Sequence, residues 1–351
     1  MEQLKGMRRH CQRLMLAMLL AAMSGCAIFA PDQLPEPVVD TPPVEAAPEP
    51  VVAEPQPQPE PKPAPVVAIP ETFGAPVAVV LTGRQPAYAG VADELAQVLE
   101  DHSLYDLSDK SQSVRQVFQQ IEAEHATAVV AIGLRAAQVA KNLSNVPVVF
   151  CQVFNIEDNQ LVSNQQKGIA SIPPLDLQFK AWLDIDPNLK NVGAILGEGH
   201  DRLLEEALAA ARSAGVNLHY RVVASDRETL YVFNRLVPDI DGFLLFPDNR
   251  VLSRDVLREM LNYASRHQVQ VAVFNESLLT LGATFSASAV DSDIASSVVI
   301  MLDKLTNGKA GTVPDVMPLK EIRIRTNEAV VRKYGLIATD VDTRDAMAGA
   351  L

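Results

Sequence analysis

Cysteine, aromatic residues and positive charge are all scarce in this 351-residue chain. It holds three cysteines and one tryptophan, and aromatic residues make up 5% of it. Three cysteines cannot build the dense disulfide framework of small secreted domains, so we expect an apolar core to hold the protein together. With 30 Lys and Arg against 43 Asp and Glu, the formal net charge is −13, and the sequence has no basic stripe for nucleic acid. We therefore expect no nucleic-acid partner.

Catalytic motifs are absent from the sequence as well. It contains no G-x-S-x-G, no H-E-x-x-H and no cysteine pair, and its six histidines are dispersed. An enzyme would need a nucleophile or a set of metal ligands, and the sequence presents neither. We therefore predict a protein that is not an enzyme, with no catalytic residue, no metal and no cofactor.

The N-terminal apolar run, LMLAMLLAAM at 14–23, has ten residues, whereas a helix that crosses the ~30 Å hydrocarbon core needs about 20. It follows a basic stretch and leads into Ser24, Gly25 and Cys26, which is the order expected of a signal peptide. Two small residues before a cysteine resemble the lipobox of bacterial lipoproteins. The resemblance implies removal of residues 1–25 and lipidation of Cys26. The alternative is an ordinary signal peptide, or a signal anchor with an incidental cysteine.

Residues 26–70 are predicted to form a lipidated, proline-rich tether. Fourteen of the 24 prolines lie within residues 31–70, which excludes helix and sheet and favours polyproline II. Fully extended at ~3.1 Å per residue, this segment would reach on the order of 120 Å. Ala27 is not the Asp that retains such lipoproteins at an inner membrane. We therefore expect a cell-envelope protein on the outer membrane facing the periplasm if the source is Gram-negative, and otherwise on the outer face of the cytoplasmic membrane.

Residues 71–351 alternate between short apolar runs and amphipathic stretches. Strands are predicted at 77–81, 128–132, 148–153, 192–196, 218–223, 242–246, 269–274, 284–289 and 321–325. Helices are predicted at 89–101, 113–124, 135–142, 175–184, 201–214, 226–236, 253–266, 291–306 and 326–334. Apolar strands separated by helices indicate α/β architecture with parallel sheets covered on both faces.

This length favours two lobes rather than one sheet. A polar stretch between Asn155 and Pro174 ends in a short strand and a double proline, after which a fresh helix–strand series begins. We predict two doubly wound parallel-sheet lobes joined by a hinge of several crossovers, with lobe 1 formed by 71–165 plus 283–351 and lobe 2 by 166–282. Ligands of open parallel sheets bind beyond the strand C-termini, so we expect a ligand in the cleft between the lobes.

Several segments resemble the ABC transporter substrate-binding proteins of the tryptophan/tyrosine-uptake type. They are PLDLQFKAWLDIDPNLKNVGAIL at 174–196, DGFLLFPDNR at 241–250, the stretch around Gly282, and IRTNEAVVRKYGL at 324–336. The resemblance covers roughly residues 126–337. It implies a type-I periplasmic binding protein fold and capture of a small ligand, often an aromatic amino acid.

In lobe 1, candidate ligand-binding residues follow two strands and open two helices. Thr82, Gly83 and Arg84 come after the first strand, where Arg84 can fork onto a carboxylate. Gly133, Leu134 and Arg135 follow the strand at 128–132. In the family this position usually carries a Thr that helps to hold the ligand carboxylate, and Leu134 stands there instead. Arg135 either replaces that contact or is a solvated residue in a first helical turn.

In lobe 2, the candidates Gly199, His200 and Asp201 stand where the family tends to have Asn-Ser, and Asp201 could equally well only cap its helix. Asp248 and Asn249 belong to the best-matched loop. In the family a carboxylate there can take the ligand ammonium, and an Asx-turn role for Asp248 is the alternative. The remaining candidates are Asn275 and the aromatic residues Tyr88 and Phe154.

These features predict a lipid-anchored solute-binding protein that captures a small ligand, an amino acid or similar, for an ABC transporter. Its expected partners are that ligand, an ABC permease or another envelope protein, and the membrane through the lipid anchor. The alternative is a non-transport envelope lipoprotein that uses the same fold as a ligand sensor or protein-interaction module. The changed family positions and the long tether favour this alternative.

Overall fold

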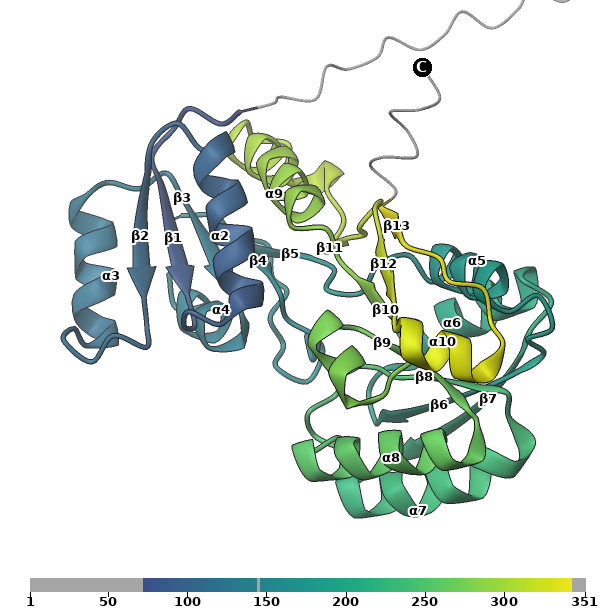
Figure 1. The fold of residues 1–351 in the computed structure, drawn as a ribbon. Coiled ribbons are helices and arrows are strands. Elements are labelled where there is room, and N and C mark those ends of the chain that lie inside the picture. Colours follow the sequence, from purple (N-terminus) through teal and green to yellow (C-terminus); the bar gives the residue numbers. More distant parts are fainter. Residues whose placement is uncertain (1–71, 144–145, 343–351) are drawn as a thin grey trace, which may run out of the picture. The chain divides into compact units, whose positions relative to one another are not determined.

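The computed structural model describes residues 72–143 and 146–342. The predicted signal peptide, Cys26 and the tether lie outside the described residues. Within the described part the chain forms two sheets, each with helices on both faces (Figure 1). The predicted α/β class with two doubly wound, mainly parallel lobes is therefore confirmed.

The first lobe is built on a six-stranded sheet in the order β11-β5-β4-β3-β1-β2, with every pairing parallel. Its strands are β1 (Val77–Leu81), β2 (His102–Asp106), β3 (Ala128–Ile132), β4 (Val148–Cys151), β5 (Gln166–Ile169) and β11 (Val316–Met317). Helices α2 (Pro86–Val98) and α9 (Asp291–Thr306) pack on one face, and α3 (Val114–Ala123) and α4 (Leu134–Ala140) pack on the other. Alternate residues of β1 enter the two cores, which explains why the strand is apolar throughout.

The second lobe is built on a seven-stranded sheet in the order β13-β12-β10-β9-β8-β6-β7. Its strands are β6 (Asn191–Gly197), β7 (Asn217–Val223), β8 (Gly242–Leu244), β9 (Gln270–Val273), β10 (Phe285–Ser288), β12 (Arg323–Thr326) and β13 (Val341–Asp342). Helices α5 (Leu175–Ile185) and α6 (Asp201–Ser213) cover one face, and α7 (Asp226–Leu236) and α8 (Arg254–His267) cover the other. Only the pairings of β12 are antiparallel in the described sheet. The last helix, α10 (Glu328–Tyr334), follows β12.

The chain passes between the two sheets three times, at 170–174, 289–290 and 318–322. The third crossover is fixed to α9, because the Asp293 carboxylate accepts hydrogen bonds from the backbone N–H groups of Lys320 and Glu321 at 2.7 and 2.9 Å. Sheet membership differs from the boundaries expected from the sequence. β5, expected in lobe 2, pairs with β4 in the first sheet. β10, β12 and β13, expected in lobe 1, belong to the second sheet, because β10 pairs with β9, β12 pairs with β10, and β13 pairs with β12.

Several helices begin at serine residues whose side chains cap them. Ser113 and Gln116 form a capping box at α3, and Ser253 caps α8 through the N–H of Val256. Ser225 caps α7, but the Glu228 carboxylate reaches the N–H of Ala224 rather than that of Ser225.

Two local interpretations were wrong. Residues 102–112, to which the sequence pattern assigns neither helix nor strand, contain β2, an edge strand whose side chains are mostly not buried. Asp201 does not cap α6, because it is the first residue of the helix and His200 occupies the N-cap position.

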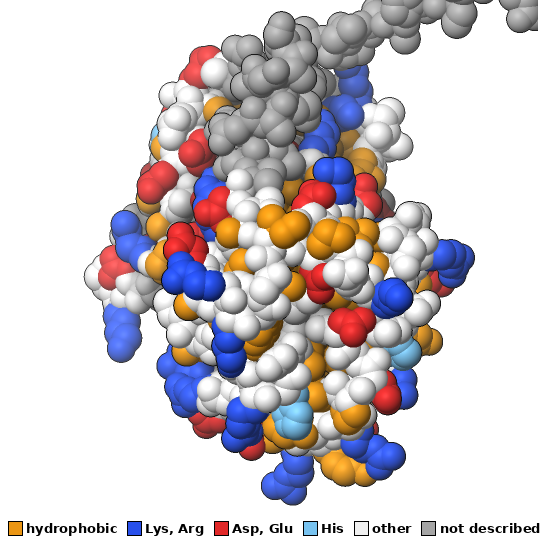
Figure 2. Space-filling view, turned by 45° about the vertical axis from the view of Figure 1, so that its right-hand side comes forward, with side chains coloured by type: hydrophobic (Ala, Val, Ile, Leu, Met, Phe, Trp, Pro, Cys, Tyr) orange, Lys and Arg blue, Asp and Glu red, His pale blue; other side chains and the backbone are white. Residues whose placement is uncertain are grey.

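The core of the second lobe contains Trp182, which is fully buried on α5 and donates a 2.7 Å hydrogen bond from Nε1 to Gln270 Oε1. Within the described residues, no helix combines the length and the apolar character that a membrane crossing requires. On the face shown in Figure 2, acidic and basic side chains are intermixed around small hydrophobic groups.

Candidate ligand-binding site

A cavity of about 530 Å³ lies where loops of the two lobes meet, and we call it the inter-lobe cleft. The first lobe contributes the N-terminus of α2, the start of α4 and the segment after β4. The second lobe contributes the loops after β8 and β9, and the second crossover and β12 complete the wall. The lining residues are Pro86, Ala87, Tyr88, Leu134, Gln152–Asn155, Ser171, Pro247, Asn249, Phe274–Glu276, Ser288, Ala289, Asp291 and Arg323. Most of these positions follow the carboxyl ends of parallel strands, where ligands of such sheets bind.

Five of the predicted ligand-binding residues line this cleft: Tyr88, Leu134, Phe154, Asn249 and Asn275. The structure therefore brings together residues from both lobes that are far apart in the sequence. A cavity of this size is within the range of small-molecule sites.

Thr82 and Gly133 lie behind the cleft wall rather than in it. Thr82 Oγ1 accepts a 3.0 Å hydrogen bond from the N–H of Ala136 and so caps the first turn of α4. Gly133 has φ of +87°, and a Cβ atom there would lie 2.8 Å from both Thr82 Oγ1 and Tyr88 Cζ. The glycine is required because it lets the tyrosine ring pack against the helix start.

Gly83, Arg84 and Arg135 do not line the cleft in the described part of the chain. Arg84 Nε pairs with Asp106 Oδ2 at 3.1 Å, at the end of β2. Arg135 Nη1 donates to the carbonyl oxygen of Leu107 at 3.3 Å. Both guanidinium groups therefore contact the end of the edge strand or the residue after it, outside the lining of the inter-lobe cleft.

Asp248 is 1% exposed, and its carboxylate is occupied by groups of its own lobe. It accepts from the backbone N–H of Gly197 at 3.0 Å and of Arg250 at 3.1 Å, and the second bond is the Asx-turn contact. The Arg250 guanidinium donates to both oxygens, and His200 Nε2 lies 3.2 Å from Oδ2. Burial alone would raise the pKa of Asp248, but hydrogen bonds from His200, Arg250 and Gly197 lower it. The Asx-turn role, in which Asp248 holds the loop after β8, thus accounts for its contacts.

The segment after β4 also ties the two lobes to each other directly. Asn155 Nδ2 donates to Asn249 Oδ1 at 3.0 Å, and Asn155 Oδ1 lies 3.1 Å from His200 Nε2. Asp158 forms an ion pair with Arg250. The Phe154 ring packs on the His200 ring with centroids 4.5 Å apart. We call these four contacts the inter-lobe latch.

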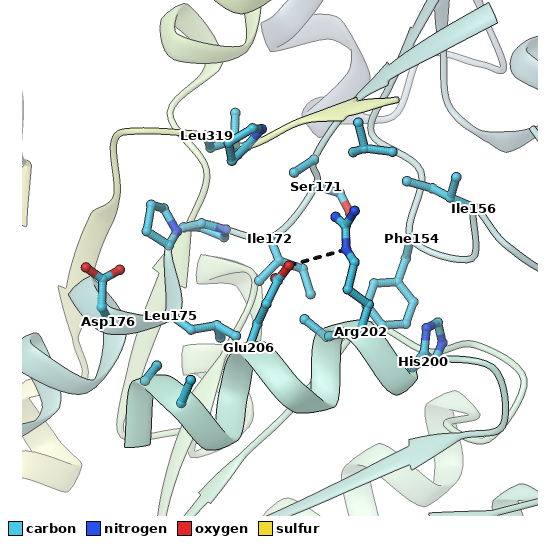
Figure 3. Close-up of a pocket in the computed structure, with 18 of the residues that line it drawn as sticks. Phe154, Ile156, Ser171, Ile172, Leu175, Asp176, His200, Arg202, Glu206 and Leu319 are labelled. Atoms are coloured by element: carbon cyan, nitrogen blue, oxygen red, sulfur yellow. Dashed lines mark ion pairs between the residues drawn. The ribbon is translucent and has the colours of Figure 1, made fainter. Parts of the chain in front are cut away.

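A second cavity, of about 840 Å³, lies beside the cleft along α6, and we call it the side cavity. Phe154 and Ser171 line both cavities, so they form the partition between them. Figure 3 shows the Arg202 and Glu206 side chains rising from α6, paired at 3.3 Å, with Phe154 beside His200. The predicted residues Gly199, His200 and Asp201 line this second cavity and not the cleft.

Sequence reasoning missed the three charged residues of the cleft, Glu276, Asp291 and Arg323. Asp291 is the first residue of α9, directly after the second crossover, and it is half-buried. Burial raises the pKa of its carboxyl group, Arg323 opposes the shift and Glu94 adds to it. Its position at the start of the predicted helix 291–306 was a signal that could have identified it.

Two α/β lobes joined by three crossovers, with a cavity at facing strand ends, define a type-I periplasmic binding protein fold. Residues 77–344 match the model of the family described as ABC transporter substrate binding protein. The chain belongs to this family, which has a solute-binding role rather than an enzymatic one and acts outside the cytoplasm. No curated protein sequence gives a significant match to it.

Solved structures support the fold. An ABC domain from Streptococcus pneumonia in complex with L-Trp has a TM-score of 0.53 and 18% identity, covering 76% of this chain and 96% of that one. A conserved domain protein from Vibrio cholerae has a TM-score of 0.53 and 19% identity, and the match again covers 76% of this chain and 96% of that one. A substrate binding protein with adhesive properties from Clostridium difficile, in its ligand-free open form, gives 0.58 and 15%, again over 76% and 96%. At these identities the likeness concerns the fold alone.

Proposed function

We propose that this protein is a lipid-anchored solute-binding protein that captures a small, amino-acid-like ligand in the inter-lobe cleft for an ABC transporter. The observation that carries the proposal is the lining of the cleft, which combines Tyr88 and Leu134 of one lobe with Asn249 and Asn275 of the other. A ligand in contact with both sets would stabilise one relative orientation of the lobes, which is how hinge closure couples to binding.

Ligand capture is tested by thermal shift of the purified full-length protein in detergent, against amino acids and other small polar metabolites. A compound class that raises the melting temperature by several degrees supports capture, because a ligand that binds the native state stabilises it by mass action. Absence of any response across the panel would contradict the proposal.

The anchor is a separate part of the proposal and has its own test. Replacement Cys26→Ser is expected to move the protein from the membrane fraction to the soluble fraction, and mass spectrometry of the wild-type N-terminal peptide is expected to show a lipid on Cys26. Cys151→Ser is the matched control, because Cys151 is buried in β4 and should leave fractionation unchanged.

A second candidate function is favoured by the inter-lobe latch and by the occupied carboxylate of Asp248. In this alternative the protein is a non-transport envelope lipoprotein that holds its lobes together to present a protein-interaction surface. Affinity purification from envelope extracts separates the two. Recovery of an ABC permease supports transport. Recovery of another envelope protein, together with no thermal shift from any compound of the ligand panel, supports the alternative.

A further inference from the structure

Charged side chains are few in the inter-lobe cleft, where they are Glu276, Asp291 and Arg323. Glu276 is exposed at the rim, whereas Asp291 is half-buried. Among the described residues, the Asp291 carboxylate makes no hydrogen bond and no ion pair. The charges of Arg323 and Glu94 act with opposite sign on its pKa.

Asp248, at the position where the family resemblance implies a carboxylate for a ligand ammonium, is occupied by contacts within its own lobe. It is 1% exposed and it accepts hydrogen bonds from Gly197 and Arg250, so it has no accessible oxygen for a ligand. Asp291, in contrast, lines the cavity, and its carboxylate oxygens accept no hydrogen bond from the described residues. Asp291, at the start of α9, is therefore the half-buried carboxylate among the residues that line the cleft.

The position of Asp291 is closely defined by the helix beside it. A Cβ atom on Gly90 of α2 would lie 2.6 Å from Asp291 Oδ2, so the carboxylate rests against the α2 backbone. Burial raises its pKa because the ionised form loses hydration. A ligand ammonium would replace that hydration with a charge-assisted hydrogen bond.

Apolar surface for the rest of the ligand is provided by Tyr88, Phe154 and Phe274, which line the same cavity. At the α4 end, the Thr82 hydroxyl already accepts from Ala136, and Leu134 presents an apolar side chain. The cleft thus offers one half-buried carboxylate among apolar and aromatic surfaces.

We propose that the cleft selects ligands that carry a protonated amine bound by Asp291 and an apolar body held among Tyr88, Phe154 and Phe274, with a ligand carboxylate dispensable. The inference rests on the proposed function, since it assigns the ligand chemistry of the same cleft. Arg323 also lines the cavity, but it already has an interaction partner within the protein, so a ligand carboxylate adds at most a secondary contact.

Three compounds with the same ring and chain test this inference: 2-phenylethylamine, L-phenylalanine and 3-phenylpropionate. Binding to the purified full-length protein in detergent is measured by isothermal titration calorimetry. We expect the two amines to bind with affinities within about tenfold of each other and the acid to bind at least about tenfold more weakly. Asp291→Asn is expected to weaken both amines by roughly tenfold or more. Asp176→Asn is the matched control, because Asp176 lines the side cavity, and it should leave binding unchanged.

A second readout needs no variant. In mildly acidic buffer, 2-phenylethylamine should release protons on binding, because pairing lowers the raised pKa of Asp291. Titrations in two buffers of different ionisation enthalpy measure that release. The other groups that face Asp291 electrostatically are Glu94, Arg323 and Cys151.

The inference is overturned by equal binding of the acid and the amine, by an Asp291→Asn variant that binds the amine as the wild type does, or by no response to any of the three compounds. These outcomes are distinct from failure of the proposed function. If the solute panel identifies a neutral sugar or a dicarboxylate as the ligand and none of the three compounds binds, the amine inference is wrong. Solute binding in the cleft would still be supported.

Discussion

The Arg250 guanidinium donates to both carboxylate oxygens of Asp248, from Nε to Oδ1 at 2.9 Å and from Nη2 to Oδ2 at 2.8 Å. Backbone N–H groups of Gly197 and Arg250 donate to the same carboxylate. Asp248 therefore joins the end of β6 to the loop after β8. Because Arg250 also pairs with Asp158 of the first lobe, the buried carboxylate supports the inter-lobe latch as well.

Asp248→Asn is expected to lower the free energy of unfolding by about 2–4 kcal/mol, because an amide cannot accept all the bonds that the buried carboxylate accepts. Urea denaturation followed by the fluorescence of Trp182, the only tryptophan of the sequence, measures the change. Glu205→Gln on exposed α6 surface is the control, with an expected effect within about 0.5 kcal/mol. Equal stability of the two variants would contradict the assignment.

Acid should remove the contribution of Asp248. Burial alone would raise its pKa, but hydrogen bonds from His200, Arg250 and Gly197 bring it below the ordinary value. A lowered folded-state pKa stabilises the protein above the unfolded-state pKa of about 3.9, and this stabilisation is lost as the pH falls through the folded-state pKa. The difference in unfolding free energy between wild type and Asp248→Asn is therefore expected to shrink progressively below about pH 4. A pH-independent difference would show that ionisation of Asp248 is not its source.

The lobes could be predicted from the sequence because their central strands are apolar throughout. Val77–Leu81 and Ala128–Ile132 are buried at every position, so local pattern and tertiary burial agree. β2 was missed because it is an edge strand in which His102 and Leu104 are exposed, and its pattern alone does not separate it from a loop.

The candidate site was only partly predictable, because strand order decides which loops meet. The stretches around Tyr88, Phe154 and Asn249 were identifiable as loop or strand ends, and all three line the cleft. Asp248 pairs with Arg250, two residues along the chain. The sequence alone does not show whether a carboxylate at this position binds a ligand or such a neighbouring arginine. The place of Asp291 at the cleft depends on the second crossover, which brings the start of α9 beside α2.

Gly133→Ala is expected to destabilise the protein by about 1–3 kcal/mol, since φ of +87° strains a side chain and the added Cβ would meet Thr82 and Tyr88. The same substitution should weaken any ligand that contacts Tyr88. Gly83→Ala is the matched control, because a Cβ there would be 3.5 Å from Ser108, an ordinary contact. Thermal unfolding of both variants measures the difference, and an equal effect at the two glycines would refute the explanation.

Cys151 is expected to be inert in the native protein. It is fully buried in β4, and burial, with a smaller effect of Asp291, raises the pKa of its thiol to about 12. The thiolate is the reactive form, so iodoacetamide at neutral pH should modify the peptide around Cys151 only after unfolding. Peptide mapping by mass spectrometry separates this cysteine from the others. Rapid modification of Cys151 in the native protein would contradict its burial.

Asp291→Asn is expected to raise the melting temperature at neutral pH, in contrast to Asp248→Asn, by no more than a few degrees after allowance for solvent screening. Burial raises the pKa of Asp291, so its ionised form disfavours the folded state. That cost is fully present above the folded-state pKa and disappears as the pH falls below the unfolded-state pKa. The stabilisation by Asn should therefore vanish in acid, and differential scanning calorimetry across pH measures it. An Asn variant that is less stable than the wild type at neutral pH would mean that the carboxylate makes a stabilising contact, and it would remove the reason to assign a ligand ammonium to it.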